Sequence, residues 1–179
     1  MELLAGCGSS RERKLSMTGD KAWKNLVTLD FNSDHSPDVV HDLTVLPYPF
    51  EDNTFDELHF YDVLEHLGQQ GDFRTFFAQF SEFWRILKPD GYLFGISPGP
   101  NSAWVFGDPG HNRVMGQECL AFLDQTEYAR QVGITPMTDY RFCYKADFSI
   151  VSSSIDGPTQ QHLYAIQAKK PARAKEGSI

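Results

Sequence analysis

The sequence predicts an α/β fold with an open, doubly wound and mostly parallel sheet. Three observations carry this prediction: short apolar segments alternate with crossover segments, one long amphipathic helix lies near the middle of the chain, and a nearly continuous apolar strand over 91–97 follows that helix. A strand that is apolar throughout is typical of a parallel sheet whose two faces are both covered.

Length and composition indicate one globular domain. The chain has 179 residues, which is enough for one well-buried core and too few for two ordinary domains. Its apolar content of 41% is that of a folded protein. We expect a single domain over 1–169 and a disordered tail over 170–179, because the tail carries no apolar face.

Charge, cysteine content and hydropathy exclude several classes of protein. A net charge of −8 disfavours a protein that grips nucleic acid mainly by charge. Three cysteines without CxxC spacing indicate neither a disulfide framework nor a zinc site. No apolar run reaches the roughly 18 residues of a membrane span, and the N-terminus lacks a signal-peptide pattern. We therefore expect a cytoplasmic protein with no membrane association.

The long helix is expected over 72–87, between four early strands and three later ones. Phenylalanines and other apolar residues recur there at three- and four-residue steps, Asp72 is placed to cap its start, and the turn 88–91 ends it. The early strands are expected at 2–5, 25–30, 37–43 and within 54–64. The later elements are the strand 91–97, a helical stretch over about 117–132, and strands around 139–152 and 161–169.

The residues that follow the early strands indicate a ligand site. In an open α/β sheet, ligands bind beyond the carboxyl ends of the strands, where the strand order reverses. The residues at those ends are Gly6, Cys7 and Gly8, then Asp30 and Phe31, then Asp42 and Leu43, and finally Tyr61, Asp62, Glu65 and His66. Two glycines and two acids that converge at one edge are typical of a nucleoside site.

The glycine loop favours S-adenosylmethionine over a dinucleotide. A dinucleotide-binding loop carries a third glycine, but Arg11 stands at that position here. S-adenosylmethionine has no phosphate, and a carboxylate at the end of the second strand can accept both of its ribose hydroxyls. Asp30 follows Gly8 at close to the spacing of about 20 residues expected for such an acid.

Four motifs in order resemble those of one family. They are "LLAGCGS", "VTLDFN", "DLTVLPYPFEDNTFDELHFYDVLEHL" and "FWRILKPDGYLFGISP", and "GDPGHNRVM" at 107–115 resembles the DPxHxR segment of a subset of the same family. From Leu3 to Pro98 the chain resembles the class I S-adenosylmethionine-dependent methyltransferases, in particular the methyltransferase type 11-like group. The resemblance implies a Rossmann-like fold with a late antiparallel strand.

The resemblance also implies an activity and a set of cofactor contacts. The expected activity is methyl transfer to an unidentified acceptor by in-line attack on the sulfonium methyl. By analogy, Asp30 holds the ribose, Asp42 the adenine amine, and Tyr61 lies beside the methyl group. The remaining expected cofactor contacts are Ala5, Gly6, Cys7, Gly8, Phe31 and Leu43.

Two departures from the family pattern keep other interpretations open. Leu4 stands where the family carries an acid, and the helical sequence that relatives carry before the first strand is missing here. The site is therefore expected to be open, or covered by an oligomer or a partner. One alternative is a catalytically inactive binding protein with the methyltransferase fold. Another is a nucleotide-binding oxidoreductase, which Arg11 disfavours.

His111 and His66 are the candidate catalytic residues. A general base is needed only where the acceptor loses a proton, and the pKa of histidine lies near neutral pH. The alternative is that the loop around His111 has only a structural role and is held by an ion pair between Asp108 and Arg113. No metal is expected, because Asp108 and His111 lack a recognisable third ligand.

The acceptor itself is expected to be a small molecule rather than a nucleic acid. The basic cluster of Arg11, Arg13 and Lys14 is expected to be a solvated loop, with contact to an acidic substrate as the alternative.

Overall fold

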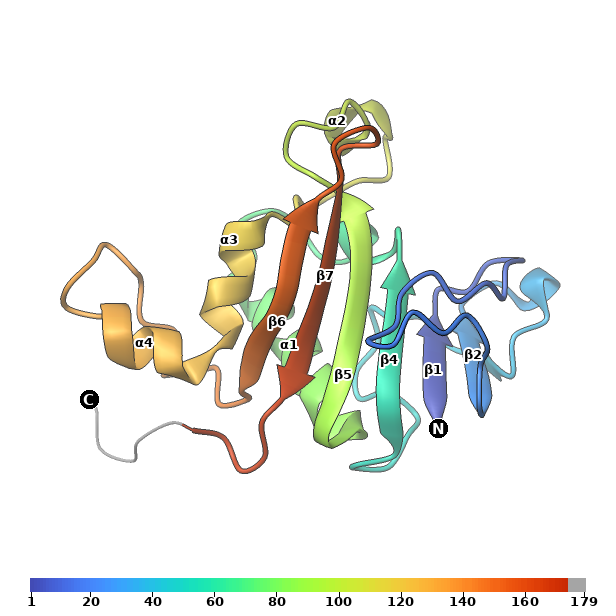
Figure 1. Cartoon of the computed structure of the whole chain (residues 1–179), viewed down its shortest axis with the longest axis horizontal. Helices are drawn as coiled ribbons and strands as arrows, with labels where there is room; N and C mark the ends of the chain where they lie inside the picture. Colours follow the sequence, from blue (N-terminus) through green and yellow to red (C-terminus); the bar gives the residue numbers. More distant parts are fainter. Residues whose placement is uncertain (174–179) are drawn as a thin grey trace.

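Seven strands form one mixed sheet in the order β3-β2-β1-β4-β5-β7-β6 (Figure 1). The computed structural model describes residues 1–173. The strands are β1 Glu2–Ala5, β2 Leu26–Asp30, β3 Val39–Val40, β4 Phe55–Tyr61, β5 Leu87–Pro98, β6 Phe148–Ile155 and β7 Gln161–Ala168. The strands from β3 to β5 run parallel, and β7 runs antiparallel to both of its neighbours. The predicted α/β fold with a late antiparallel strand is confirmed.

The helix α1, Phe73–Ile86, covers one face of the sheet with its phenylalanine stripe. Asp72 caps it by accepting a hydrogen bond from the amide of Thr75, as predicted. Phe83 is fully buried and contacts Phe60, with 4.6 Å between ring centroids. Burial of one such side chain contributes about 1.5–3 kcal/mol, so the stripe fixes how α1 sits on the sheet.

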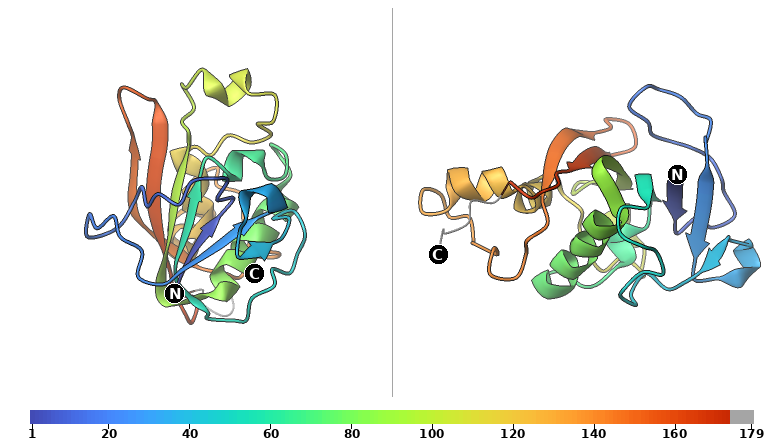
Figure 2. Two further views of the ribbon diagram at one scale, coloured as in Figure 1. Left: turned by 90° about the vertical axis from the view of Figure 1, so that its right-hand side faces the viewer. Right: turned by 90° about the horizontal axis from the view of Figure 1, so that it is seen from below.

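A loop, not a helix, joins β1 to β2 and crosses the face opposite α1 (Figure 2). Within this loop Arg13 is only 4% exposed and forms ion pairs with Glu2 and Glu57. The guanidinium of Arg11 donates to the carbonyls of Gly8 and His35. The expectation of a solvated basic loop is therefore wrong for Arg11 and Arg13, because local charge and backbone partners tie both side chains down.

The region after β5 differs from the expected single helix over 117–132. It contains three short pieces: α3 Gln117–Leu120, the 3-10 turn η3 Ala121–Leu123 and α4 Gln125–Gln131. Asp124 interrupts the helix because its carboxylate caps a new start at Thr126. The other short helical elements are η1 Ser33–His35, η2 Leu64–His66 and α2 Trp104–Gly107.

Two expected strands are shorter or shifted. The third strand is reduced from 37–43 to Val39–Val40. On one side the carboxylate of Asp38 accepts a hydrogen bond from the amide of Thr28, and on the other the carboxylate of Asp42 accepts one from the amide of Thr44. The sixth strand begins at Phe148 instead of near 139. Tyr144 explains the difference, since its buried hydroxyl donates to the carbonyl of Leu123 and holds the preceding segment against the helices.

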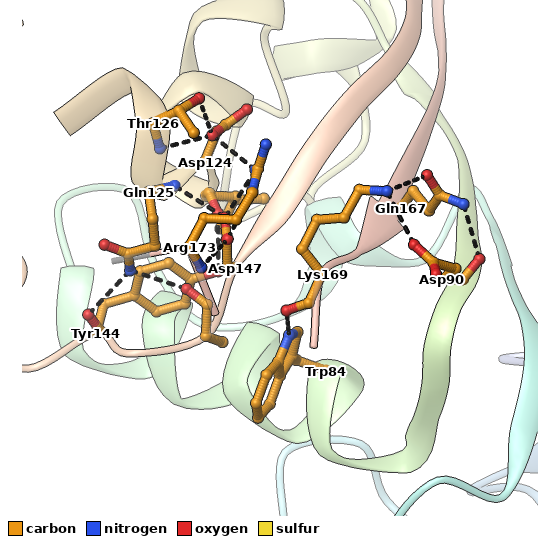
Figure 3. Close-up of polar contacts among 12 residues, drawn as sticks. Trp84, Asp90, Asp124, Gln125, Thr126, Tyr144, Asp147, Gln167, Lys169 and Arg173 are labelled. Carbon is orange, nitrogen blue, oxygen red and sulfur yellow. Dashed lines mark hydrogen bonds and ion pairs between the residues drawn. The ribbon is translucent and has the colours of Figure 1, made fainter. Parts of the chain in front are cut away.

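The start of the expected tail contacts the domain (Figure 3). The guanidinium of Arg173 pairs with the carboxylates of Asp124 and Asp147, and Lys170 lies 4.5 Å from the ring centroid of Trp84. Residues 174–179, which complete the predicted disordered tail, lie outside the described residues. Across the described chain, no helix is long and apolar enough to cross a membrane.

Candidate functional site

A cavity of about 400 Å³ opens at the carboxyl ends of β1, β2 and β4. These strand ends lie at the upper edge of the sheet in Figure 1. The strand order reverses here, since β1 has β2 on one side and β4 on the other. The predicted site residues that line the cavity are Gly6, Gly8, Asp30, Phe31, Asp42, Leu43 and His66. Residues far apart in the chain are thus brought together as predicted.

The loop after β1 approaches the cavity without side chains. Gly6 has φ +62°, and a Cβ there would lie 2.5 Å from Cγ2 of Val63, so no larger residue fits. Gly8 has φ +51°, and a Cβ there would meet nothing within 4 Å. The backbone at Gly8 is therefore open to a ligand, while the backbone at Gly6 packs directly against the side chain of Val63.

Asp30 is the polar centre of the cavity. Its carboxylate accepts hydrogen bonds from the amides of Gly8 (2.8 Å) and Asn32 (2.9 Å), and it lies 3.3 Å from Nδ1 of His35. Burial raises the pKa of Asp30, but these hydrogen bonds and His35 outweigh that effect and lower the pKa below its usual value. Asp30 is therefore ionised at neutral pH, and its Oδ2 retains a lone pair for a hydroxyl donor.

The opposite rim combines one acid with apolar surface. One oxygen of Asp42 accepts hydrogen bonds of 2.8 Å from the amide and the hydroxyl of Thr44. Leu43 is buried, and its carbonyl is held by the hydroxyl of Tyr48. Phe31 is 74% exposed at the end of β2, which leaves its ring free to stack on a flat ligand.

Three expected cofactor contacts do not line this cavity. Ala5 is fully buried within β1, and Cys7 and Tyr61 line a separate cavity of about 60 Å³. The hydroxyl of Tyr61 accepts hydrogen bonds from the amides of Lys14 and Leu15. Tyr61 thus faces the loop that crosses the sheet, and its expected place beside the methyl group stays a prediction. Burial raises the pKa of Tyr61 to about 12.

A second cavity, of about 200 Å³, adjoins the first. Asp62 lines both cavities, and Glu65, Trp104 and His111 line the second one. Asp62 has φ +59°, a conformation that few residues other than glycine adopt and that often marks a functional site. The two cavities therefore meet at Asp62, their shared lining residue.

The rings of His66, which lines the first cavity, and His111, which lines the second, lie against each other. His66 lies in η2 directly after β4, and His111 lies in the loop after α2, with 4.6 Å between the ring centroids. The loop is fastened to η2, because the amides of Asn112 and Arg113 donate to the carbonyl of Glu65 (2.9 and 3.0 Å). Both candidate catalytic histidines are thus placed together by backbone contacts.

Arg113 does not pair with Asp108. Its guanidinium donates to the carbonyls of Gln69 and Asp72 and lies 4.8 Å from the ring centroid of Phe76. The carboxylate of Asp108 instead accepts from the amide of Gly110. The loop is therefore held in place by backbone carbonyls that accept from Arg113, and not by the ion pair that the structural interpretation expected.

Two residues of the site were not assigned a role from the sequence. Glu65 is 1% exposed beside the histidines, and burial raises its pKa. In the sequence, only its position after the fourth strand indicated that Glu65 belongs to the site. His35 contacts Asp30 because η1 turns the chain back, and nothing in the residue spacing indicates that turn. Glu65, His66 and His111 are also the residues that could hold a metal ion.

Comparison with known proteins supports the fold. A family model described as a methyltransferase domain matches residues 3–95. No curated protein matches the sequence significantly. A SAM-dependent methyltransferase from Archaeoglobus fulgidus superposes with a TM-score of 0.58 at 16% identity, over 93% of this chain and 85% of that chain.

Two further solved structures are similar. One is a chain of the complex between the Haloferax volcanii Trm112 methyltransferase activator and the putative methyltransferase, with a TM-score of 0.59 at 12% identity, over 94% of this chain and 82% of that chain. The other is the N-methyltransferase NodS from Bradyrhizobium japonicum in complex with S-adenosyl-L-homocysteine, with a TM-score of 0.53 at 15% identity, over 94% of this chain and 77% of that one. At such identities the likeness shows the fold.

Proposed function

This chain belongs to the methyltransferase-domain family, and we propose that it transfers the methyl group of S-adenosylmethionine to a small-molecule acceptor. The observation that carries the proposal is the cavity of about 400 Å³, in which Asp30 and Asp42 face a side-chain-free glycine loop. Its volume falls within the roughly 300–1,000 Å³ typical of small-molecule sites.

The charges of this cavity fit a cationic nucleoside. Asp30, Asp42 and Asp62 all line it, and neither arginine nor lysine is among its lining residues. Carboxylates repel the phosphates of a dinucleotide but attract a sulfonium cation. We infer that Asp30 accepts a hydrogen bond from the ribose and that Asp42 accepts one from the adenine amine, since both carboxylates line the cavity. Phe31 and Leu43 supply apolar contact for the base.

We assign the acceptor to the adjoining cavity of about 200 Å³. When bound, S-adenosylmethionine supplies an activated methyl group, which the acceptor takes in line as the carbon–sulfur bond breaks. The protein's contribution is alignment of the acceptor, which can lower the barrier by several kcal/mol. His111 lines this cavity and the ring of His66 lies against that of His111, so His111 is the nearer candidate to take a proton from the acceptor.

Calorimetry tests the cofactor assignment directly. We expect S-adenosylmethionine and S-adenosylhomocysteine to bind and NAD not to bind. Asp30→Ala should weaken binding of S-adenosylmethionine more than tenfold, since it removes the ribose acceptor and one anchor of the glycine loop. Asp34→Ala, at an exposed position of η1, is the matched control and should leave the affinity unchanged. Equal affinity in both variants would refute the ribose assignment.

A specific observation favours a second function, that of a binding protein without catalysis. Leu4, where the family carries an acid, is 3% exposed and lines the small cavity beside Lys14. An apolar side chain there cannot accept a hydrogen bond from a ligand. Tight binding of S-adenosylmethionine without turnover on any pool of small-molecule acceptors would favour this alternative.

A further inference from the structure

Three potential metal ligands converge beside the acceptor cavity, which Glu65 and His111 line, while His66 lines the cofactor cavity. Glu65 and His66 come from η2, and His111 comes from the loop after α2. One ligand atom from each residue lies within 4.8 Å of the other two. Backbone hydrogen bonds from Asn112 and Arg113 to Glu65 hold the two segments together, so the cluster belongs to the fold and does not depend on loose surface side chains.

Glu65 carries an oxygen that has no partner. The residue is 1% exposed, and its Oε2 accepts a 3.0 Å hydrogen bond from the hydroxyl of the fully buried Ser97. Within the part of the chain that the structure describes, Oε1 of Glu65 is buried and unbonded. Buried polar atoms are almost always satisfied, and an unsatisfied one costs about 1–3 kcal/mol. The unsatisfied oxygen therefore indicates a ligand that completes the site.

Both imidazole rings have one nitrogen fixed by a backbone carbonyl. Nδ1 of His66 lies 3.0 Å from the carbonyl oxygen of Gly110, and Nδ1 of His111 lies 2.8 Å from that of Trp104. A carbonyl only accepts, so each neutral ring carries its proton on Nδ1 and its lone pair on Nε2. Metal-binding histidines are oriented in the same way, with the second ring nitrogen donating to a carbonyl or carboxylate.

We propose that Oε1 of Glu65 and Nε2 of His66 and His111 bind a divalent first-row transition-metal ion. Two imidazoles and one carboxylate are the donor set of open zinc sites and of other sites that keep coordination positions free. Magnesium and calcium prefer sites built from oxygen alone. Asp62 and Asp108 line the same cavity and add negative charge that favours a cation.

The proposed ion also narrows the class of acceptor, and this step rests on the proposed methyl transfer. Its free coordination positions would take an oxygen of the molecule in the acceptor cavity. The acceptor would then be a small molecule with a hydroxyl or carboxylate group beside the position to be methylated. With the ion bound, His66 and His111 serve as ligands and no longer as bases.

The test uses the whole chain, freed of metal by a chelator, without cofactor or acceptor. Titration with Co²⁺, followed by visible absorption and calorimetry, should show one equivalent bound, and Zn²⁺ should compete for the same site. Zn²⁺ should also raise the melting temperature, because it binds the folded chain. Glu65→Gln and His111→Gln should each weaken binding by at least about tenfold. His41→Gln, which removes an imidazole outside the cluster, should bind like the wild type.

Several outcomes would overturn the proposal. These are the absence of a single bound equivalent, equal affinity in the wild type and His111→Gln, or binding that is lost in Cys143→Ser, since that thiol is exposed. His111 lies in a loop outside the sheet and is less buried than Glu65, so its variant remains informative where the variant of Glu65 fails to fold. Metal binding is measured without S-adenosylmethionine, so its failure leaves the cofactor assignment standing, and a failure of cofactor binding leaves the metal result standing.

Discussion

The amide of Gly8 donates a 2.8 Å hydrogen bond to Oδ2 of Asp30, and this bond joins the loop after β1 to the end of β2. Two of the residues expected to contact the cofactor are therefore held together by a direct hydrogen bond. A change at Asp30 alters the loop as well as the charge of the cavity, so affinity and stability have to be measured separately.

Asp30→Asn should reduce the loss of unfolding free energy that occurs as the pH falls from 7 to 3. The pKa of Asp30 is lowered in the folded state, mainly because backbone amides and His35 outweigh the effect of burial. Such a carboxylate stabilises the fold above its unfolded pKa of about 3.9, and that contribution is lost as the pH falls through the folded value. Urea unfolding between pH 7 and pH 3 should show a smaller decrease in stability for the variant. An unchanged slope would contradict the assignment.

Gly6→Ala should lower mainly the stability of the fold, whereas Gly8→Ala should lower mainly the affinity for the cofactor. Gly6→Ala places a methyl group 2.5 Å from Val63 and should destabilise the fold by about 1–3 kcal/mol. Gly8→Ala meets nothing within 4 Å, so it should cost less stability but lower the affinity for S-adenosylmethionine. Denaturant melts and calorimetry on both variants check this contrast. Partial rescue of Gly6→Ala by Val63→Ala would identify the clash as the cause.

Arg13→Met should be strongly destabilising. Arg13 is 4% exposed and neutralises Glu2, which is equally buried, together with Glu57. Removal of one partner from a buried ion pair typically costs about 3–5 kcal/mol, because the other charges remain buried. Arg130→Ala, at an exposed helix position, is the control and should change the melting temperature little. Similar melting temperatures for the two variants would show that the loop over the sheet is not held by Arg13.

Arg173→Ala should lower stability even though it lies near the end of the chain. Its guanidinium bonds the fully buried carboxylate of Asp147 (Figure 3), and the variant leaves that carboxylate with fewer donors. We expect a loss of about 1–2 kcal/mol, since Arg173 is itself one-third exposed. Lys169→Ala removes bonds to the exposed Asp90 and to the side chain of Gln167, leaves no buried charge unpaired, and is the control. Equal unfolding free energies would show that Arg173 does not hold the fold.

The parts of the fold that depend on local sequence were predictable. The stripe of α1 with its cap at Asp72 lies close to where it was expected, and the nearly continuous apolar strand predicted over 91–97 lies within β5. Elements with weak local signals were predicted less well. Tyr144 makes a contact across the chain to Leu123, and this contact explains why the segment before Phe148 does not join the sheet.

The sequence by itself determined which segments form the parallel strands and which acids follow them. Both depend on turn chemistry and hydrophobic periodicity, which are local properties. Only the tertiary structure decided where long side chains point. It turned Tyr61 toward the loop over the sheet, buried Arg13 against Glu2, and brought His111 to His66 and Glu65. These outcomes depend on which segments meet in space, and the free energy of such contacts cannot be read from residue spacing along one strand or helix.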